Sequence, residues 1–206
     1  MKKTLLFAVL FIMSMSTNAQ LFANLNAKSN ENGGQTQNDR VSLSNTAKFA
    51  EKYGKILQIQ YFDLPSVSMF AGKFSADVLL FSELGTGNKT CCVRVTFHSM
   101  ITASTYYLDV DEIDNFLVFI ERLNDEFLLT TPSVKTAYSY ISRDNIMLRA
   151  EYETNKWKIN LSGESVYDLV IMTKSKLKDF ATMMQEAKNV IDAHPEYKPN
   201  TVSLSE

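Results

Sequence analysis

Apolar residues recur at helical spacing in two stretches of the chain, 108–123 and 172–187. Intervals of three and four positions place such residues along one side of an α-helix. The two stretches stay in phase when 64 is subtracted from the numbers of the second: Leu177 matches Ile113, Phe180 matches Phe116, Met183 matches Phe119 and Met184 matches Ile120. The pattern therefore predicts two helices that belong to two copies of one repeat.

Before each helix, apolar and polar positions alternate, which is the period of a β-strand. The pattern predicts strands at 57–63, 74–81, 91–98 and 105–108 in the first copy, and at 138–141, 146–152, 157–161 and 166–172 in the second. Trp157, Ile159 and Leu161 stand 64 positions after Val93, Val95 and Phe97. The match between the two copies therefore includes strands as well as helices.

These patterns predict an α+β fold made of two repeated β4α units, 55–128 and 136–193, each an antiparallel sheet with one packed C-terminal helix. We expect both units to lie in a single domain, 46–195. The preceding residues, 20–45, are rich in Asn, Ser, Gln and Gly and are expected to form a disordered linker, because they bury too little apolar surface to offset the entropy of ordering. A flexible tail is expected at 196–206.

Both predicted helices begin at a residue that can cap them, Asp109 in the first and Thr173 in the second. Glu112 completes a capping box with Asp109, whereas Lys176 in the matching position cannot. We expect the apolar stripe of each helix to lie across the sheet of its own unit.

The order of four strands and one helix, present twice along the chain, resembles the tandem arrangement of Whirly-type single-strand DNA-binding proteins. The resemblance covers units 55–128 and 136–193 and lies in the order of their elements. It implies two sheets related by a pseudo-two-fold axis.

The first residues follow the pattern of a secretory signal peptide, with Lys2 and Lys3, an apolar run over 5–13 and the triplet 17–19. We expect a signal peptide at 1–19 with cleavage after Ala19, and therefore a secreted or periplasmic protein. The apolar run is shorter than the roughly 20 residues that span a bilayer, and no later stretch approaches that length. We therefore expect no transmembrane segment after cleavage.

Charge argues against a nucleic-acid partner. The chain has 21 basic and 23 acidic residues, and removal of Lys2 and Lys3 with the signal peptide leaves 19 basic residues and a net charge of −4. Binding to phosphates requires a concentrated basic surface. Apolar residues make up 45% of the chain, which is enough to build a core.

The most conspicuous charge cluster is Asp109, Asp111, Glu112 and Asp114. A calcium loop would need oxygen ligands around a turn, usually with a glycine at the bend, and this stretch has no glycine. Acidic residues in a first helical turn are explained by capping and by the helix dipole. The cluster therefore predicts a helix start, and we expect no bound metal and no cofactor.

The two cysteines are adjacent, so a strand at 91–98 turns Cys91 toward one face and Cys92 toward the other, together with His98. Cys92 and His98 stand six residues apart, about 20 Å along a strand, and cannot share an ion. Cys91 is expected in the core. For Cys92 two interpretations stay open: a thiol covered by the protein, or one cross-linked to a partner.

The sequence contains no nucleophile elbow, phosphate-binding glycine loop, zinc-protease motif or Cys-x-x-Cys pair. We therefore expect a non-catalytic binding or adaptor protein of the bacterial cell envelope that acts through a sheet face or edge on a protein or small-molecule partner. The alternative is an envelope hydrolase that uses carboxylates on peptide or glycan substrates, because such pairs meet only in space. The candidate partner contacts are Cys92, Asp111, Asp114, Lys174 and Lys178.

Overall fold

The computed structural model describes residues 42–51, 53–67, 73–98, 103–165 and 167–198. The chain divides into two compact parts, Met1–Arg40 and Val41–Glu206, and every described residue belongs to the second. The predicted signal peptide and the predicted linker as far as residue 41 lie outside the described residues.

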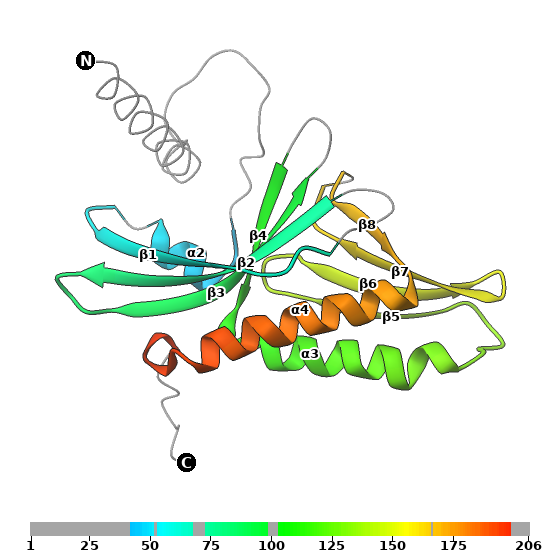
Figure 1. Ribbon diagram of the computed structural model, residues 1–206. Coiled ribbons are helices and arrows are strands. Elements are labelled where there is room, and N and C mark those ends of the chain that lie inside the picture. Colours follow the sequence, from blue (N-terminus) through cyan, green and yellow to red (C-terminus); the bar gives the residue numbers. More distant parts are fainter. Residues whose placement is uncertain (1–41, 52, 68–72, 99–102, 166, 199–206) are drawn as a thin grey trace, which may run out of the picture. The chain divides into compact units, whose positions relative to one another are not determined.

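The described residues form two four-stranded antiparallel sheets, each followed by a helix (Figure 1). The first repeat consists of β1 (Ile56–Asp63), β2 (Lys73–Leu84), β3 (Lys89–His98), β4 (Ala103–Asp109) and α3 (Val110–Asp125). The second consists of β5 (Thr136–Ile141), β6 (Met147–Glu153), β7 (Lys156–Ser162), β8 (Leu169–Met172) and α4 (Lys174–Asp192). The predicted α+β class and the repeated β4α order are confirmed.

In both sheets the strands are paired in chain order, β1-β2-β3-β4 and β5-β6-β7-β8. Val93 in β3 lies opposite Leu108 in β4, and Ile159 in β7 lies opposite Met172 in β8. Since Leu108 and Met172 are 64 positions apart, Val93 corresponds to Ile159 and not to Trp157 as predicted. The third strands match at an interval of 66, because the connection to the last strand is two residues longer in the first repeat.

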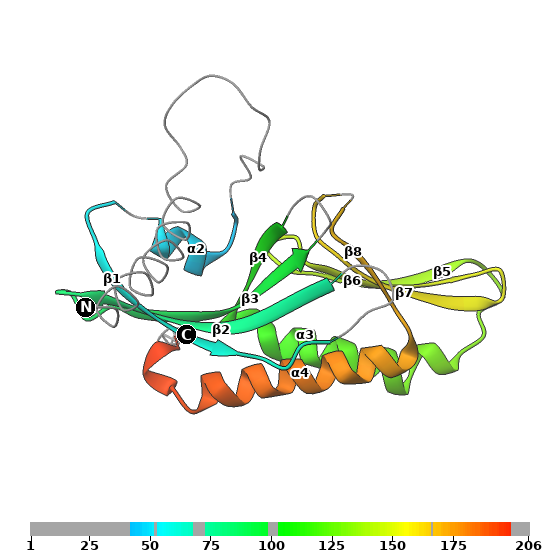
Figure 2. The same ribbon diagram turned by 45° about the horizontal axis from the view of Figure 1, so that its top comes forward.

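The two helices share one core: each contacts its own sheet, as predicted, and also packs against the sheet of the other repeat. Phe116 of α3 packs against Tyr140 of β5 in the second sheet, with ring centroids 5.0 Å apart. Phe180 of α4 packs against Phe74 of β2 in the first sheet at 5.6 Å. The two helical rings also touch each other, at 5.8 Å. Helices α3 and α4 therefore lie side by side beneath both sheets (Figure 2).

The N-terminal strap, defined as residues 42–51, is packed on the first sheet. It contains α2 (Asn45–Ala50) and lies on the outer face, meaning the face turned away from α3 and α4 (Figure 2). Ser42 and Ser44 are buried. The packed structure thus includes the last residues of the predicted linker, because their polar groups find partners in the domain.

The C-terminal boundary also differs from the prediction. The short 3-10 helix η2 (Pro195–Tyr197) follows α4, and Tyr197 is buried. Its hydroxyl group forms a hydrogen bond of 2.9 Å with Ser82 Oγ in β2. The start of the predicted flexible tail is therefore part of the packed domain.

Among the described residues, no helix is both long and apolar enough to cross a membrane.

Candidate functional site

The predicted acidic cluster lies where β4 ends and α3 begins. Asp109 is the N-cap residue, and its backbone N–H donates to Glu112 Oε2 at 3.2 Å in the predicted capping box. The Asp109 carboxylate accepts hydrogen bonds from the strap: 2.7 Å from Ser44 Oγ, 2.8 Å from Asn45 N and 3.1 Å from Thr46 N. Burial raises the pKa of Asp109, but these bonds and one from Arg143 outweigh it, and the net pKa lies below its ordinary value.

Arg143, from the turn between β5 and β6, inserts its guanidinium group into the same cluster. It pairs with Asp109, and its Nη2 donates to Asp111 Oδ2 at 2.8 Å. The backbone N–H of Arg143 donates to Glu112 Oε1 at 2.6 Å. Oxygen atoms of Asp109, Asp111 and Glu112 lie within 4.8 Å of one another, close enough to ligate an ion. The guanidinium group and the backbone N–H of Arg143 already bind these three carboxylates, so the arrangement is explained as a junction between the two repeats.

Asp144, in the same turn as Arg143, is a second anchor for the strap. Its carboxylate accepts hydrogen bonds from Ser42 Oγ at 2.7 Å and from Leu43 N at 3.0 Å. The other carboxylate oxygen accepts one from the backbone N–H of Tyr107 in β4 at 2.8 Å. Two buried carboxylates, one from each repeat, therefore hold the strap on the domain.

Beneath the strap, the outer face of the first sheet is apolar. Leu79, Phe81 and Cys92 are buried there, and Phe49 and Ala50 of α2 pack on them. Cys92 has no exposed surface. Burial raises the pKa of its thiol well above the ordinary value, and the neighbouring Asp109 carboxylate adds to this. The structure thus shows the covered form of Cys92; a cross-link to a partner would require the strap to move.

The outer face of the second sheet has no such cover among the described residues. Ile141, Leu169 and Ile171 are 60%, 45% and 55% exposed. The strand register places Ile141, Met147, Ser162 and Leu169 in one row across all four strands, and Ile171 stands in the next row. We call Ile141, Met147, Leu169 and Ile171 the apolar strip. Sequence reasoning missed it, although the run Leu-Val-Ile-Met at 169–172, apolar on both faces of an edge strand, is a signal that could have found it.

Much of the rest of this outer face is charged. Lys135 pairs with Glu151 at 2.9 Å and with Glu153 at 3.0 Å, and Lys158 pairs with Glu153 at 3.0 Å. Arg149 lies 3.5 Å from Glu151. The positive and negative side chains of these pairs compensate one another's charge at the surface. The pairs do not account for the exposed apolar strip beside them.

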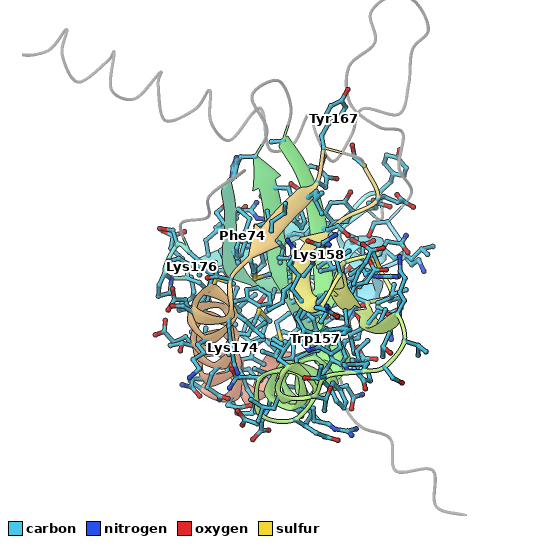
Figure 3. The ribbon with its side chains drawn as sticks, turned by 90° about the vertical axis from the view of Figure 1, so that its right-hand side faces the viewer. Phe74, Trp157, Lys158, Tyr167, Lys174 and Lys176 are labelled. Atoms are coloured by element: carbon cyan, nitrogen blue, oxygen red, sulfur yellow. The ribbon has the colours of Figure 1, made fainter. Side chains whose placement is uncertain are left out.

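The remaining predicted contact residues lie on the helices. Asp114 pairs with Lys188 of α4 at 2.8 Å and so links the two helices. Lys174 and Lys178 are exposed on α4. Figure 3 labels Lys174 at the start of α4 and Lys158 in β7. The structure therefore brings Asp111 to the junction and leaves the lysines at the second helix start, directly after β8, so the predicted residues do not form one site.

A third buried polar group joins the repeats. The Tyr106 hydroxyl of β4 donates to the buried Asp168 carboxylate and accepts from the backbone N–H of Glu164 at 2.8 Å. Burial and the bond to Asp168 raise the pKa of Tyr106 to about 12. Gly163 makes room for the ring, because a Cβ atom there would stand 2.3 Å from Tyr106 Cζ. No local pattern predicts this contact, since its partners are 62 positions apart.

Comparison of the chain with protein-family models, with curated proteins and with solved structures finds no match.

Proposed function

We propose that the protein is an exported, non-catalytic binding or adaptor protein of the bacterial cell envelope, and that it binds a partner protein through the outer face of the second sheet. The observation that carries the proposal is the apolar strip, where three large apolar side chains are about half exposed on one face. Exposed apolar side chains grouped on one face of a domain are typical of interaction sites. The secretory pattern at 1–19 supports the compartment.

The charge beside the strip supports a partner segment that carries apolar and acidic side chains. Lys174 follows β8 by two positions and is exposed, whereas Lys158, one strand away, already pairs with Glu153. Apolar contact with Leu169 and Ile171 would supply the affinity, and Lys174 would favour a carboxylate at the rim of the interface. The net negative charge of the expected mature chain does not favour a nucleic acid.

The alternative function, a carboxylate-dependent hydrolase, has no support from the acidic cluster. Arg143 and backbone N–H groups bind the carboxylates of Asp109, Asp111 and Glu112, so these groups serve the junction.

We also propose that the two repeats are related by a pseudo-two-fold axis, in the order that resembles Whirly-type proteins. The equal strand order and the matched starts of α3 and α4 support this. Superposition of 55–128 on 136–193 tests it: α3 should fall on α4 when β3 falls on β7.

The binding proposal is tested by capture from an envelope extract with the immobilised protein and two charge variants. Ile171→Glu places a carboxylate in the apolar strip and should abolish capture of the specific partner. Val118→Glu is the matched control, because Val118 is 52% exposed on α3, away from the sheet. A partner retained by the wild type and by Val118→Glu but lost by Ile171→Glu supports the proposal. Equal capture by all three variants, or none by the wild type, would overturn it.

A further inference from the structure

The first sheet carries apolar surface on both faces, and only one of them belongs to the main core. Leu79, Phe81 and Cys92 alternate with core residues of β2 and β3 and point to the outer face. Without the strap, this face would expose an apolar patch like the one on the second sheet. The strap therefore occupies a surface that is itself suited to binding a peptide segment.

The polar contacts of the strap lie at one end of it. Its helix has six residues, well below the roughly 12–15 that an isolated helix needs to be stable, so it depends on its contacts with the sheet. Two carboxylates, Asp109 and Asp144, accept five hydrogen bonds from residues 42–46. The apolar contacts lie further along the strap, where Ala47 is buried and Phe49 and Ala50 are partly buried against the sheet.

The strap can also leave without pulling the sheet apart. It joins β1 close to Gly54, whose φ of 78° lies in the left-handed region that glycine adopts without strain. Lys55, beyond this point, is fixed to the sheet by an ion pair with Glu83 at 2.7 Å. A change of backbone angles near Gly54 would thus free the strap while β1 stays paired with β2.

From these contacts we propose that residues 42–51 form a displaceable strap that opens locally, and that the outer face beneath it is a second binding surface for a peptide segment of the strap's own chemistry. Such a segment begins a short helix with a hydroxyl group and free backbone N–H groups that bind Asp109, and it places an aromatic side chain on Leu79 and Phe81. The proposal goes beyond the function proposed for the second sheet, because it concerns the other repeat and a covered surface.

The adjacent cysteines provide the test, because they report on the two faces of one strand. Cys92 lies under the strap, whereas Cys91 lies in the main core. The rate of modification by a thiol reagent would be measured for Cys92 in a Cys91→Ala variant and for Cys91 in a Cys92→Ala variant, across low urea concentrations. Local opening predicts that Cys92 reacts faster and with a smaller dependence on urea, since little surface is exposed when the strap opens.

Two further substitutions separate local opening from global unfolding. Ser44→Ala removes the cap of α2 and the bond to Asp109, and should speed the reaction of Cys92 roughly 5- to 30-fold. Ile159→Val in the second sheet lowers global stability, and should speed the reaction of Cys91 while leaving that of Cys92 unchanged. Equal urea dependence for both thiols, or equal acceleration of both by Ile159→Val, would overturn the displaceable strap.

A peptide with the sequence of residues 42–53 tests the binding surface. Added to the Ser44→Ala, Cys91→Ala protein, it should slow the modification of Cys92, and a scrambled peptide should not. Millimolar peptide is required, because a short linker keeps the protein's own strap at a comparable effective concentration. If neither peptide slows the reaction while the urea and substitution results hold, the strap opens but the face beneath it is not a peptide-binding surface.

Discussion

The two repeats contribute to one shared core but differ in their outer faces. In the first sheet, Leu79, Phe81 and Cys92 make the outer face apolar, and the strap covers it. In the second, charged pairs occupy most of the outer face and a narrower apolar strip stays exposed. The comparison teaches that the shared core constrains one face of each strand, while the other face is free to acquire a cover or a binding surface.

The starts of the two helices differ in the same way. Asp109 and Thr173 both precede a helix, and Thr173 Oγ1 accepts the expected capping bond from Lys176 N at 3.2 Å. Asp109 is charged and buried, so it also binds the strap and Arg143. The same structural position is thus a local cap in the second repeat and part of a junction between distant parts of the chain in the first.

The largest effect is expected from substitutions that test whether the two repeats share one core. Leu80→Ala in the first sheet and Leu148→Ala in the second each remove a fully buried side chain, and each should lower the free energy of unfolding by about 2–5 kcal/mol. Urea unfolding would be followed by circular dichroism and by the fluorescence of Trp157, which lies in the second sheet. Both variants should shift one common transition. A Trp157 transition unchanged by Leu80→Ala would show that the repeats unfold independently.

The next effect concerns the contact between Tyr106 and Gly163. Gly163→Ala forces a methyl group into the Tyr106 ring and should destabilise the protein by about 1–3 kcal/mol. Ser162→Ala, one position earlier on the outer face of β7, should change the stability by less than about 0.5 kcal/mol. Thermal or urea unfolding of the two variants measures the difference. Equal stabilities would mean that the ring does not rest on Gly163.

A smaller effect on stability is expected when the caps of α2 and α4 are removed. Thr173→Ala removes one capping bond from α4 and should cost about 1 kcal/mol. Ser44→Ala removes the cap of α2 together with a bond to a buried carboxylate, and should cost more than Thr173→Ala, up to about 2 kcal/mol. The free energies of unfolding in urea give the ranking, and the opposite ranking would contradict the role of the strap bonds.

The smallest expected effect is a difference between the two helix starts in how the stability of the protein depends on pH. The folded state holds the pKa of Asp109 below its unfolded value, so Asp109 stabilises the fold fully above the unfolded pKa, about 3.9. This contribution is lost as the pH falls through the folded pKa. Stability should therefore decrease more between pH 6 and pH 3 in the wild type than in Asp109→Asn. Thr173→Ala should keep the wild-type pH dependence, because Thr173 does not titrate.

Sequence periodicity predicted the strands and helices because each pattern is local. The strand at 91–98 follows from the alternation of its own residues, and the structure confirms it. The caps Asp109 and Thr173 likewise follow from residues close to them in sequence, and the structure confirms both. The sharing of α3 and α4 between the sheets is not readable in this way, since a stripe of apolar residues does not specify which sheet it meets. The bonds of Ser42 to Asp144, 102 positions away, leave no local signal either. What could not be predicted is therefore the set of contacts between repeats.

The positions of the strap's anchors also fix an order of events during synthesis. Ser44 cannot form its bond until Asp109, 65 positions later, has been synthesised, and Ser42 cannot form its bond until Asp144 has been synthesised. At about 5–20 residues per second, the second anchor is made roughly 5–20 s after the residue that binds it. Once β4 has been made the strap can bind Asp109, but its second anchor is complete only after Asp144 has followed. The earliest described residues of the domain therefore complete some of its last contacts.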